Sequence, residues 1–293
     1  MLPIYLTLLS VSLYSGAAII RKKISAVDEE LNYAFSQLFQ MLGGIFTIVF
    51  ALLFGMGGEF LHFTASMTPV IVFKIVVSSI LWFSSTVLTF KALHTVSASK
   101  FSIIEALSPV VSIVFALLLL NEHFSLMQFI GMVVILLAVI AVVYDKETKY
   151  SRITRSELLA IASVCLSGLA LVNDKGIFLA MPTAPALTLG FFLPGVIGIS
   201  LKPKEIQKVK VILGMKNVMK QLTIMSAIWS VAALLYYKAI IASNSLSLIV
   251  SVSQLSVILT VLLGFLLLKE TKNWQIKIAA AIASVIGLII MSR

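Results

Sequence analysis

Charged side chains are scarce in this chain of 293 residues, because only 12% of them are Asp, Glu, Lys or Arg while 60% are hydrophobic. The mean hydropathy is +1.10. A soluble domain of this size could not bury so much apolar surface. The composition therefore excludes a soluble globular protein and makes a lipid bilayer the expected surroundings.

Groups for covalent and metal chemistry are also few. The single cysteine, Cys165, falls in an apolar run, which excludes a disulfide framework and favours a small core residue over a redox or metal site. The histidines His62, His94 and His123 fall in or near expected loops, and no HExxH or G-x-S-x-G motif occurs. An intramembrane enzyme is thus disfavoured and no cofactor is expected. The sequence also lacks a G-x-x-x-x-G-K-[ST] stretch, so ATP is not the expected energy source.

Long apolar runs are what the chain has in abundance. Ten runs of roughly 18–24 residues are long enough to cross about 30 Å of hydrocarbon. The first run lacks the basic start and the Ala-x-Ala pattern of a signal peptide, so it is counted as a span. We predict an all-α integral membrane protein with ten transmembrane helices, at 3–20, 31–54, 69–90, 97–120, 125–144, 157–181, 184–201, 221–241, 246–268 and 273–291.

One hydrophobic unit occurs twice in the chain. WFSSTVLTFKAL (82–93) matches WSVAALLYYKAI (229–240), which aligns Trp82 with Trp229 and places them 147 positions apart. Each unit holds five spans, an odd number, so the second unit must enter the membrane from the opposite face. We therefore predict a five-plus-five inverted repeat, with units at 1–146 and 157–293 and a linker at 147–156. Inverted repeats are typical of transporters that work by alternating access.

Basic residues are distributed unevenly over the expected loops. All 22 Lys and Arg residues except Lys74, Lys175, Lys238 and Arg293 are assigned to loops on one side of the membrane. The positive-inside rule makes that side cytoplasmic and places both termini outside. The lysine-rich stretch 202–220 then faces lipid headgroups rather than nucleic acid. The predicted location is the plasma (inner) membrane, with several spans and a monomeric or weakly dimeric state.

Polar stripes indicate which helices line a path through the membrane. Positions i, i+4, i+7 and i+11 share one helix face, and spans 1–4 and 6–9 carry polar residues on such faces. Spans 5 and 10 are almost wholly apolar, so we expect them to lie outside a central cavity, against lipid. The small residues Ala279, Ala283 and Gly287 of span 10 predict close packing, either against Gly131 of span 5 or against a dimer partner.

The segment KALHTVSASKFSIIEALSPVVSIVFALLLLNEHFSLMQFIG (91–131) and its echo from Lys238 to Ala279 resemble the drug/metabolite transporter superfamily in its ten-helix EamA-type form. Both segments show a helix of small residues, an acidic residue closing an apolar run, and a helix rich in Gly or Ala. The likeness covers essentially the whole chain. It implies a five-plus-five inverted repeat around a central cavity and an exporter or exchanger role. The second copy departs from the pattern, because Pro109 aligns with Val257.

Ten residues are candidates for contact with a transported solute. Glu105 leads, because it lies about 12 Å into span 4, where a carboxylate is costly unless it binds a proton, a cationic group or a structural partner. Trp82 and Trp229 lie mid-helix and could stack on a solute or pack between helices. Lys74 could bind an anionic group or extend to the interface. The other candidates are Gln40, Tyr14, Ser108, Ser253, Gln254 and Tyr236.

Other charged residues are assigned to the scaffold. Lys91 and Lys238 are expected to anchor helix ends at the membrane interface. Glu122 and Glu270 are each expected to cap the helix that begins two or three residues later. Asp174 is expected either to pair with its neighbouring lysine within the membrane or to be solvated near a loop.

The predicted function is a secondary transporter of a small organic metabolite. We expect an exporter that works by alternating access, with a proton as a candidate coupling ion and amino acids or related compounds as candidate solutes. A nucleotide-sugar or organic-phosphate exchanger of the same superfamily is the alternative. That function would require several basic residues in the cavity, and the sequence places few there.

Overall fold

The structure is a computed structural model that describes residues 2–120, 125–143, 153–242 and 255–291, together with 249, 252 and 253. Its described elements are all helices. In chain order they are α1 (Leu2–Ser25), α2 (Asn32–Leu53), α3 (Glu59–His62), η1 (Phe63–Ser66), α4 (Pro69–Thr95), α5 (Ala98–Glu105), α6 (Leu107–Leu120), α7 (Leu126–Val143), α8 (Arg155–Ala180), α9 (Thr183–Leu201), α10 (Glu205–Gly214), α11 (Lys216–Ile241), α13 (Leu255–Leu268) and α14 (Trp274–Met291).

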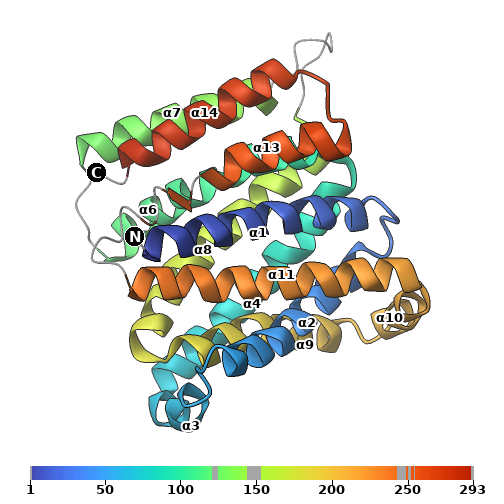
Figure 1. The fold of residues 1–293 in the computed structure, drawn as a ribbon, viewed down its shortest axis with the longest axis vertical. Helices are drawn as coiled ribbons and strands as arrows, with labels where there is room; N and C mark the ends of the chain where they lie inside the picture. Colours follow the sequence, from blue (N-terminus) through green and yellow to red (C-terminus); the bar gives the residue numbers. More distant parts are fainter. Residues whose placement is uncertain are drawn as a thin grey trace.

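The long helices lie side by side and run between the same two ends of the molecule (Figure 1). Helices α7 and α14 form one edge of the bundle, α2 and α9 lie near the other, and the remaining long helices lie between them. The short helix α10 lies at one end, and α3 lies at the opposite end. Helix α1 starts and helix α14 finishes at the same end, so both ends of the described chain lie on one side.

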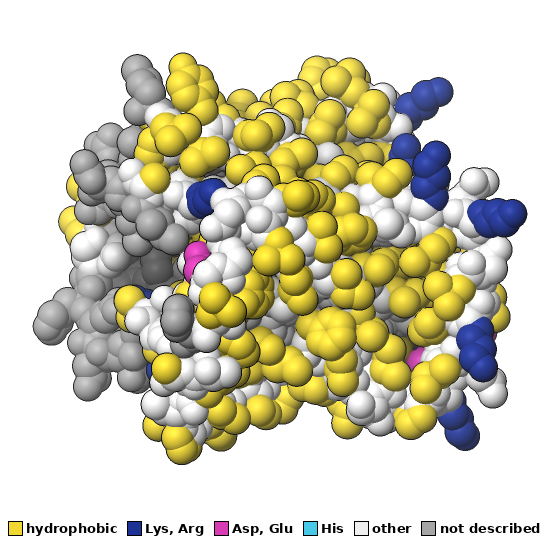
Figure 2. Space-filling view, turned by 60° about the horizontal axis from the view of Figure 1, so that its bottom comes forward, with side chains coloured by type: hydrophobic (Ala, Val, Ile, Leu, Met, Phe, Trp, Pro, Cys, Tyr) yellow, Lys and Arg dark blue, Asp and Glu magenta, His cyan; other side chains and the backbone are white. Residues whose placement is uncertain are grey.

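The surface of the bundle suits a bilayer. Helices α1, α2, α4, α8, α9 and α11 are long and apolar enough to cross a membrane, and the shorter apolar helices α7, α13 and α14 lie beside them. Large apolar side chains such as Phe73 (68% exposed), Leu137 (61%) and Leu266 (67%) point outward. Figure 2 shows a broad hydrophobic surface, with Lys and Arg gathered at one end of the molecule. A broad apolar surface of this kind is what lipid requires of a spanning protein.

Most predicted spans coincide with a helix to within a few residues, but span 4 does not. The expected continuous helix at 97–120 is two helices, α5 and α6, separated at Ala106. Pro109 explains the break, because proline has no N–H to donate to the carbonyl of Glu105 and its ring crowds that carbonyl. Much of the first half of span 9 lies outside the described residues. Helices α3 and α10, with the 3₁₀ turn η1, were not predicted.

Helices α7 and α14 pack through small residues, as predicted for spans 5 and 10. A Cβ added at Gly287 would come within 2.8 Å of the Gly131 carbonyl oxygen and of Ile135. The two backbones therefore touch only because position 287 has no side chain. The expected partner within the same chain is confirmed.

Glu270 caps a helix, but not the one expected. Its carboxylate accepts hydrogen bonds from the backbone N–H groups of Ala98 (2.7 Å) and Ser99 (3.0 Å) at the start of α5, and also from the Ser99 hydroxyl. The expected partner was α14, the helix that follows Glu270 in the chain. The carboxylate instead satisfies free N–H groups in the first half of the chain, where the helix dipole also favours a negative charge. Glu122 lies outside the described residues.

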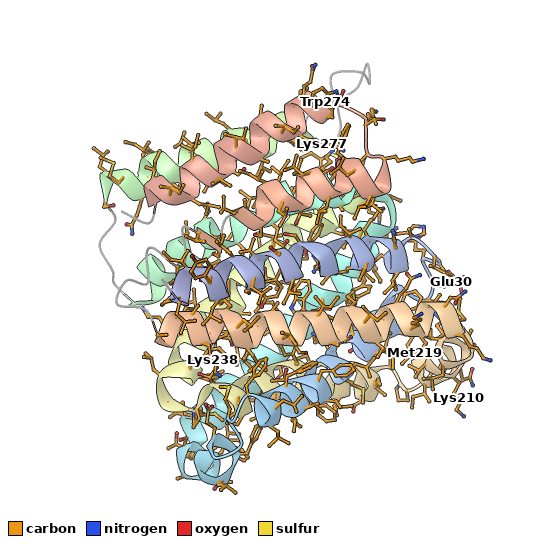
Figure 3. All side chains as sticks on the ribbon, in the orientation of Figure 1. Glu30, Lys210, Met219, Lys238, Trp274 and Lys277 are labelled. Carbon is orange, nitrogen blue, oxygen red and sulfur yellow. The ribbon has the colours of Figure 1, made fainter. Side chains whose placement is uncertain are left out.

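The lysine-rich end is held together by further contacts between elements. Lys277 lies 3.8 Å from Glu270 and donates to the Ser97 hydroxyl at 3.2 Å. Lys100 of α5 pairs with Glu157, which also completes a capping box with Thr154 at the start of α8. Figure 3 shows Lys277 at this side of the molecule and Lys238 at the other.

Lys238 contacts the end of α2. Its ammonium group lies 3.4 Å from the Phe54 carbonyl oxygen and 5.3 Å from the centroid of the Phe54 ring. Phe54 follows the last residue of α2, so the lysine ties the end of α11 to the end of α2.

Candidate functional site

A cavity of about 390 Å³ lies inside the bundle. Its walls come from α1, α2, α4, α5, α6, α8, α9, α11 and α13, and from Ser253. No described residue of α7 or α14 lines it. Cavities of this size hold small organic molecules.

The first charged cluster of the cavity joins α1 to the end of α5. An Arg21 guanidinium nitrogen lies 3.8 Å from a Glu105 carboxylate oxygen, and the Arg21 side chain is 8% exposed whereas that of Glu105 is 47% exposed. The guanidinium also lies over the ring of Trp229, 4.9 Å from its centroid, and 5.3 Å from that of Phe101. Tyr14 meets Trp229 edge to face at 5.0 Å. Arg21 is thus a buried cation enclosed by a carboxylate and aromatic faces.

The helix break places Glu105 in this cluster. Glu105 is the last residue of α5, and the chain turns at Ala106 before α6 begins. Glu105 lines the cavity, and the missing proline N–H frees the chain to turn directly after it. Pro109, which interrupts predicted span 4, thus also helps to place the Glu105 carboxylate in the cavity wall.

The second charged cluster joins α8 to α4. The Asp174 carboxylate accepts a hydrogen bond from the Trp82 indole N–H at 2.8 Å on one oxygen and one from the Ser78 hydroxyl on the other. The neighbouring Asn173 amide donates to the Lys74 backbone carbonyl at 2.7 Å, which fixes the register of the two helices. Asp174 therefore lies in the cavity wall and is held there by neutral donors rather than solvated near a loop.

The two clusters correspond to each other under the repeat, and each joins residues from both halves of the chain. Two alignments relate the halves. One pairs Trp82 with Trp229 at an offset of 147 positions, and the other pairs Ser10 with Ser163 at an offset of 153. The second alignment pairs Arg21 with Asp174. Each cluster therefore joins a tryptophan to a charged residue, which is a cation (Arg21) in the first cluster and a carboxylate (Asp174) in the second.

Corresponding contacts also hold the helices together. The Ser10 hydroxyl donates to the Ala232 carbonyl at 2.7 Å, and the Ser85 hydroxyl donates to the Ser163 carbonyl at 2.8 Å. In the two alignments, Ser10 corresponds to Ser163 and Ala232 to Ser85. Helix α1 therefore meets α11 at the same depth at which α8 meets α4.

Comparison with protein families identifies the chain. The model of the EamA-like transporter family matches residues 1–144. This match places the chain in the EamA-like transporter family. The family belongs to the drug/metabolite transporter superfamily, so the protein is a membrane transporter with several membrane-spanning helices.

A comparison of structures extends beyond residue 144. One solved protein, described only as the crystal structure of a protein, matches 99% of this chain and 96% of its own with a TM-score of 0.59 and 16% sequence identity. At that identity the match shows a shared fold and nothing of function. No curated protein matches the sequence significantly.

In this EamA-like transporter, eight of the ten candidate residues line the cavity. They are Glu105, Trp82, Trp229, Gln40, Tyr14, Ser108, Ser253 and Tyr236. Gln254 lies outside the described residues. Lys74 does not line the cavity, because its ammonium group turns against the backbone at Gly176. Gln40 is engaged with the scaffold, since its amide donates to the Trp82 carbonyl (3.2 Å) and the Thr86 hydroxyl (2.9 Å).

Sequence reasoning did not include Arg21 and Asp174 among the site residues of this EamA-like transporter. Both lay on polar stripes, and Asp174 was considered only as a partner of its neighbour. The signal that could have found them is the repeat alignment, which places an arginine opposite an aspartate within apolar helices. A search for identical residues passes over a pair whose charge is inverted.

Proposed function

We propose that this EamA-like transporter carries small amino acids or related organic solutes by alternating access, without ATP. The cavity is exposed in turn to the two sides of the membrane by movement of two inverted five-helix units, 1–146 and 157–293, joined by the linker 147–156. The energy comes from a gradient of the solute or of a coupling ion, for which a proton is the first candidate. The observation that carries the proposal is a cavity whose described walls come from both units.

The packing of the helices supports the inverted repeat. If spans 1–5 correspond to spans 6–10, each contact should recur between the corresponding helices. Helix α1 packs on α11 as α8 packs on α4, and α1 packs on α13 as α8 packs on α6. The pairs α2·α9 and α7·α14 each join corresponding helices. Such matched contacts give the two units near-equivalent arrangements, open to one side or to the other.

The cavity wall supports an organic solute with an apolar body. Aromatic residues from seven of the described helices line it, including Tyr14, Trp82 and Trp229. Aromatic faces bind apolar and cationic groups by burial and by their quadrupole. An amino acid or amine with a ring or long side chain fits such a wall.

The charges of the wall do not favour a phosphate. A nucleotide sugar or organic phosphate carries at least one full negative charge, and protein sites usually meet it with several basic groups. Among the described lining residues, Arg21 is the one lysine or arginine, and Glu105 already pairs with it. Asp174 adds a further negative charge. The amino-acid class is therefore preferred over the phosphate class.

We also propose that the lysine-rich end faces the cytoplasm of a plasma (inner) membrane. The exposed side chains of Lys204, Lys210 and Lys216 gather near α10, at the end where Figure 3 shows Lys210. Basic groups at that end meet anionic headgroups and are retained on the cytoplasmic side during insertion.

Uptake into proteoliposomes tests the proposed function. The protein is reconstituted, and saturable uptake is measured for radiolabelled amino acids, aromatic amines and organic phosphates. Gly190 lines the cavity and has nothing within 4 Å of an added Cβ, so Gly190→Phe should fill the cavity and abolish uptake. Gly16 has the same free space but does not line the cavity, so Gly16→Phe is the matched control and should retain uptake. Equal uptake by wild type and Gly190→Phe would contradict the proposal.

A further inference from the structure

Asp174 is the only described carboxylate in the cavity wall that is held by neutral hydrogen-bond donors alone. Glu105, the other carboxylate there, lies beside Arg21. Asp174 has the Ser78 hydroxyl and the Trp82 indole N–H. A carboxylate removed from bulk water is costly unless a cation compensates it. The Asp174 carboxylate is thus a negative charge in the cavity wall, and its two neutral hydrogen-bond donors do not neutralise it.

The first charged cluster shows what a completed arrangement looks like. There, a cation (Arg21), a carboxylate (Glu105) and an aromatic face (Trp229) lie together. The corresponding positions of the second cluster hold a carboxylate and a tryptophan, Asp174 and Trp82, because an aspartate occupies the position of the arginine. The component missing from the second cluster is the cation.

We propose that Asp174, positioned by Ser78 and Trp82, binds the ammonium group of the transported solute. The inference rests on the proposed function, since it assigns a recognition element to the same cavity. The solute supplies to the second cluster the cation that Arg21 supplies to the first. The chemical class is a primary amine or an amino acid carrying an apolar or aromatic body.

The local geometry suits this role. Each carboxylate oxygen of Asp174 accepts one hydrogen bond from the protein, so each retains acceptor capacity for a further donor. The two donors come from α4 and fix the carboxylate before a solute arrives, which lowers the entropy lost on binding. One helical turn beyond Asp174, the Phe178 ring stacks on Tyr237 with centroids 4.5 Å apart, and both residues line the cavity. This aromatic wall lies where the body of the solute would follow its ammonium group.

Three probes of similar shape test the proposal in nanodiscs that contain the full-length protein. Phenethylamine carries an ammonium group alone, phenylalanine carries an ammonium and a carboxylate, and 3-phenylpropanoate carries a carboxylate alone. We expect Asp174→Asn to weaken the binding of phenethylamine and phenylalanine by about tenfold or more, because a charge-assisted hydrogen bond is lost. Binding of 3-phenylpropanoate should stay unchanged or become tighter.

Three further variants separate recognition from folding. Asp174→Glu retains the charge and should restore part of the preference for amines, whereas Trp82→Phe removes one positioning donor and should weaken amine binding less than Asp174→Asn does. Glu105→Gln removes the carboxylate that already has a cation, so it should change the amine preference less than Asp174→Asn. Thermal unfolding of each variant shows whether it is folded.

The outcomes distinguish this inference from the proposed function. If the wild type binds amines and folded Asp174→Asn retains the same preference among the three probes, Asp174 does not bind the ammonium group, while transport through the cavity stands. If Asp174→Asn does not fold, amine binding in folded Trp82→Phe that equals that of the wild type overturns the inference. If the wild type binds none of the three probes and transports no amine, the proposed substrate class fails as well.

Discussion

The contact between Glu270 and α5 gives the sharpest prediction of stability, because one side chain links the two halves of the chain. The Glu270 side chain is 9% exposed and accepts hydrogen bonds from two backbone N–H groups, at 2.7 Å and 3.0 Å, while Lys277 lies 3.8 Å away. Replacing it with alanine leaves two helix-terminal N–H groups without an acceptor and a largely buried ammonium group without its counter-charge.

The expected cost follows from these groups. A hydrogen bond to a charged group contributes about 1.5–3 kcal/mol, and the loss of an N-cap costs about 0.5–2 kcal/mol. The two terms describe the same interactions and do not add, so we expect Glu270→Ala to lower the free energy of unfolding by about 3 kcal/mol. Glu270→Gln retains a carbonyl acceptor and loses the charge, so about half of that cost is expected.

Reversible unfolding in mixed micelles, followed by circular dichroism over an SDS titration, measures these free energies. Glu59→Ala is the matched control, because the Glu59 carboxylate accepts one backbone N–H, that of Ala184 at the start of α9, at 2.8 Å. About 1 kcal/mol is expected there. If Glu270→Ala cost no more than Glu59→Ala, the link between the halves would contribute nothing beyond an ordinary cap, and the reasoning would be refuted.

Three further predictions concern packing, the cavity charges and orientation. Gly287→Leu should lower the free energy of unfolding by about 2 kcal/mol or more, because its Cβ would meet the α7 backbone, whereas Gly16→Leu, with free space around it, should cost far less; the same SDS titration checks both. A double-mutant cycle with Arg21→Met and Glu105→Gln should give a coupling of about 1–2 kcal/mol, reduced from that of a fully buried pair because Glu105 is half-exposed; additive costs would show that the two charges do not interact. In a variant without its native cysteine, Lys210→Cys should resist an impermeant maleimide added to intact cells and react after lysis, and labelling of intact cells would reverse the proposed orientation.

The sequence predicted best those features that depend on a single helix. An apolar run of the right length becomes a spanning helix in lipid whatever its neighbours are, so most helix positions were found. The absence of polar stripes in spans 5 and 10 identified two long helices whose described residues do not line the cavity, and Gly287 against Gly131 identified their contact.

Features that depend on contacts between distant segments could not be predicted from the sequence as well. Glu270 was expected to cap a helix, and its partner α5 could be known only from the path of the chain. Span 4 was predicted as one helix, so its break at Ala106, and hence the exposure of Glu105, could be found only from the backbone. Arg21 and Asp174 were not selected as site residues, because a repeat is recognised by identical residues. These two residues are aligned in the repeat but carry opposite charges.

The central claim, that one cavity is exposed alternately to the two sides, is tested most directly by trans-stimulation. Proteoliposomes are loaded with radiolabelled phenylalanine, or with whichever amine the uptake panel selects, and its efflux is measured with and without the unlabelled solute outside. A carrier that must return through the membrane moves faster with solute bound on the return step, so the account predicts accelerated efflux that saturates with the external concentration. Efflux that stays unchanged or slows as external solute is added, with Gly190→Phe equal to the wild type, would contradict it.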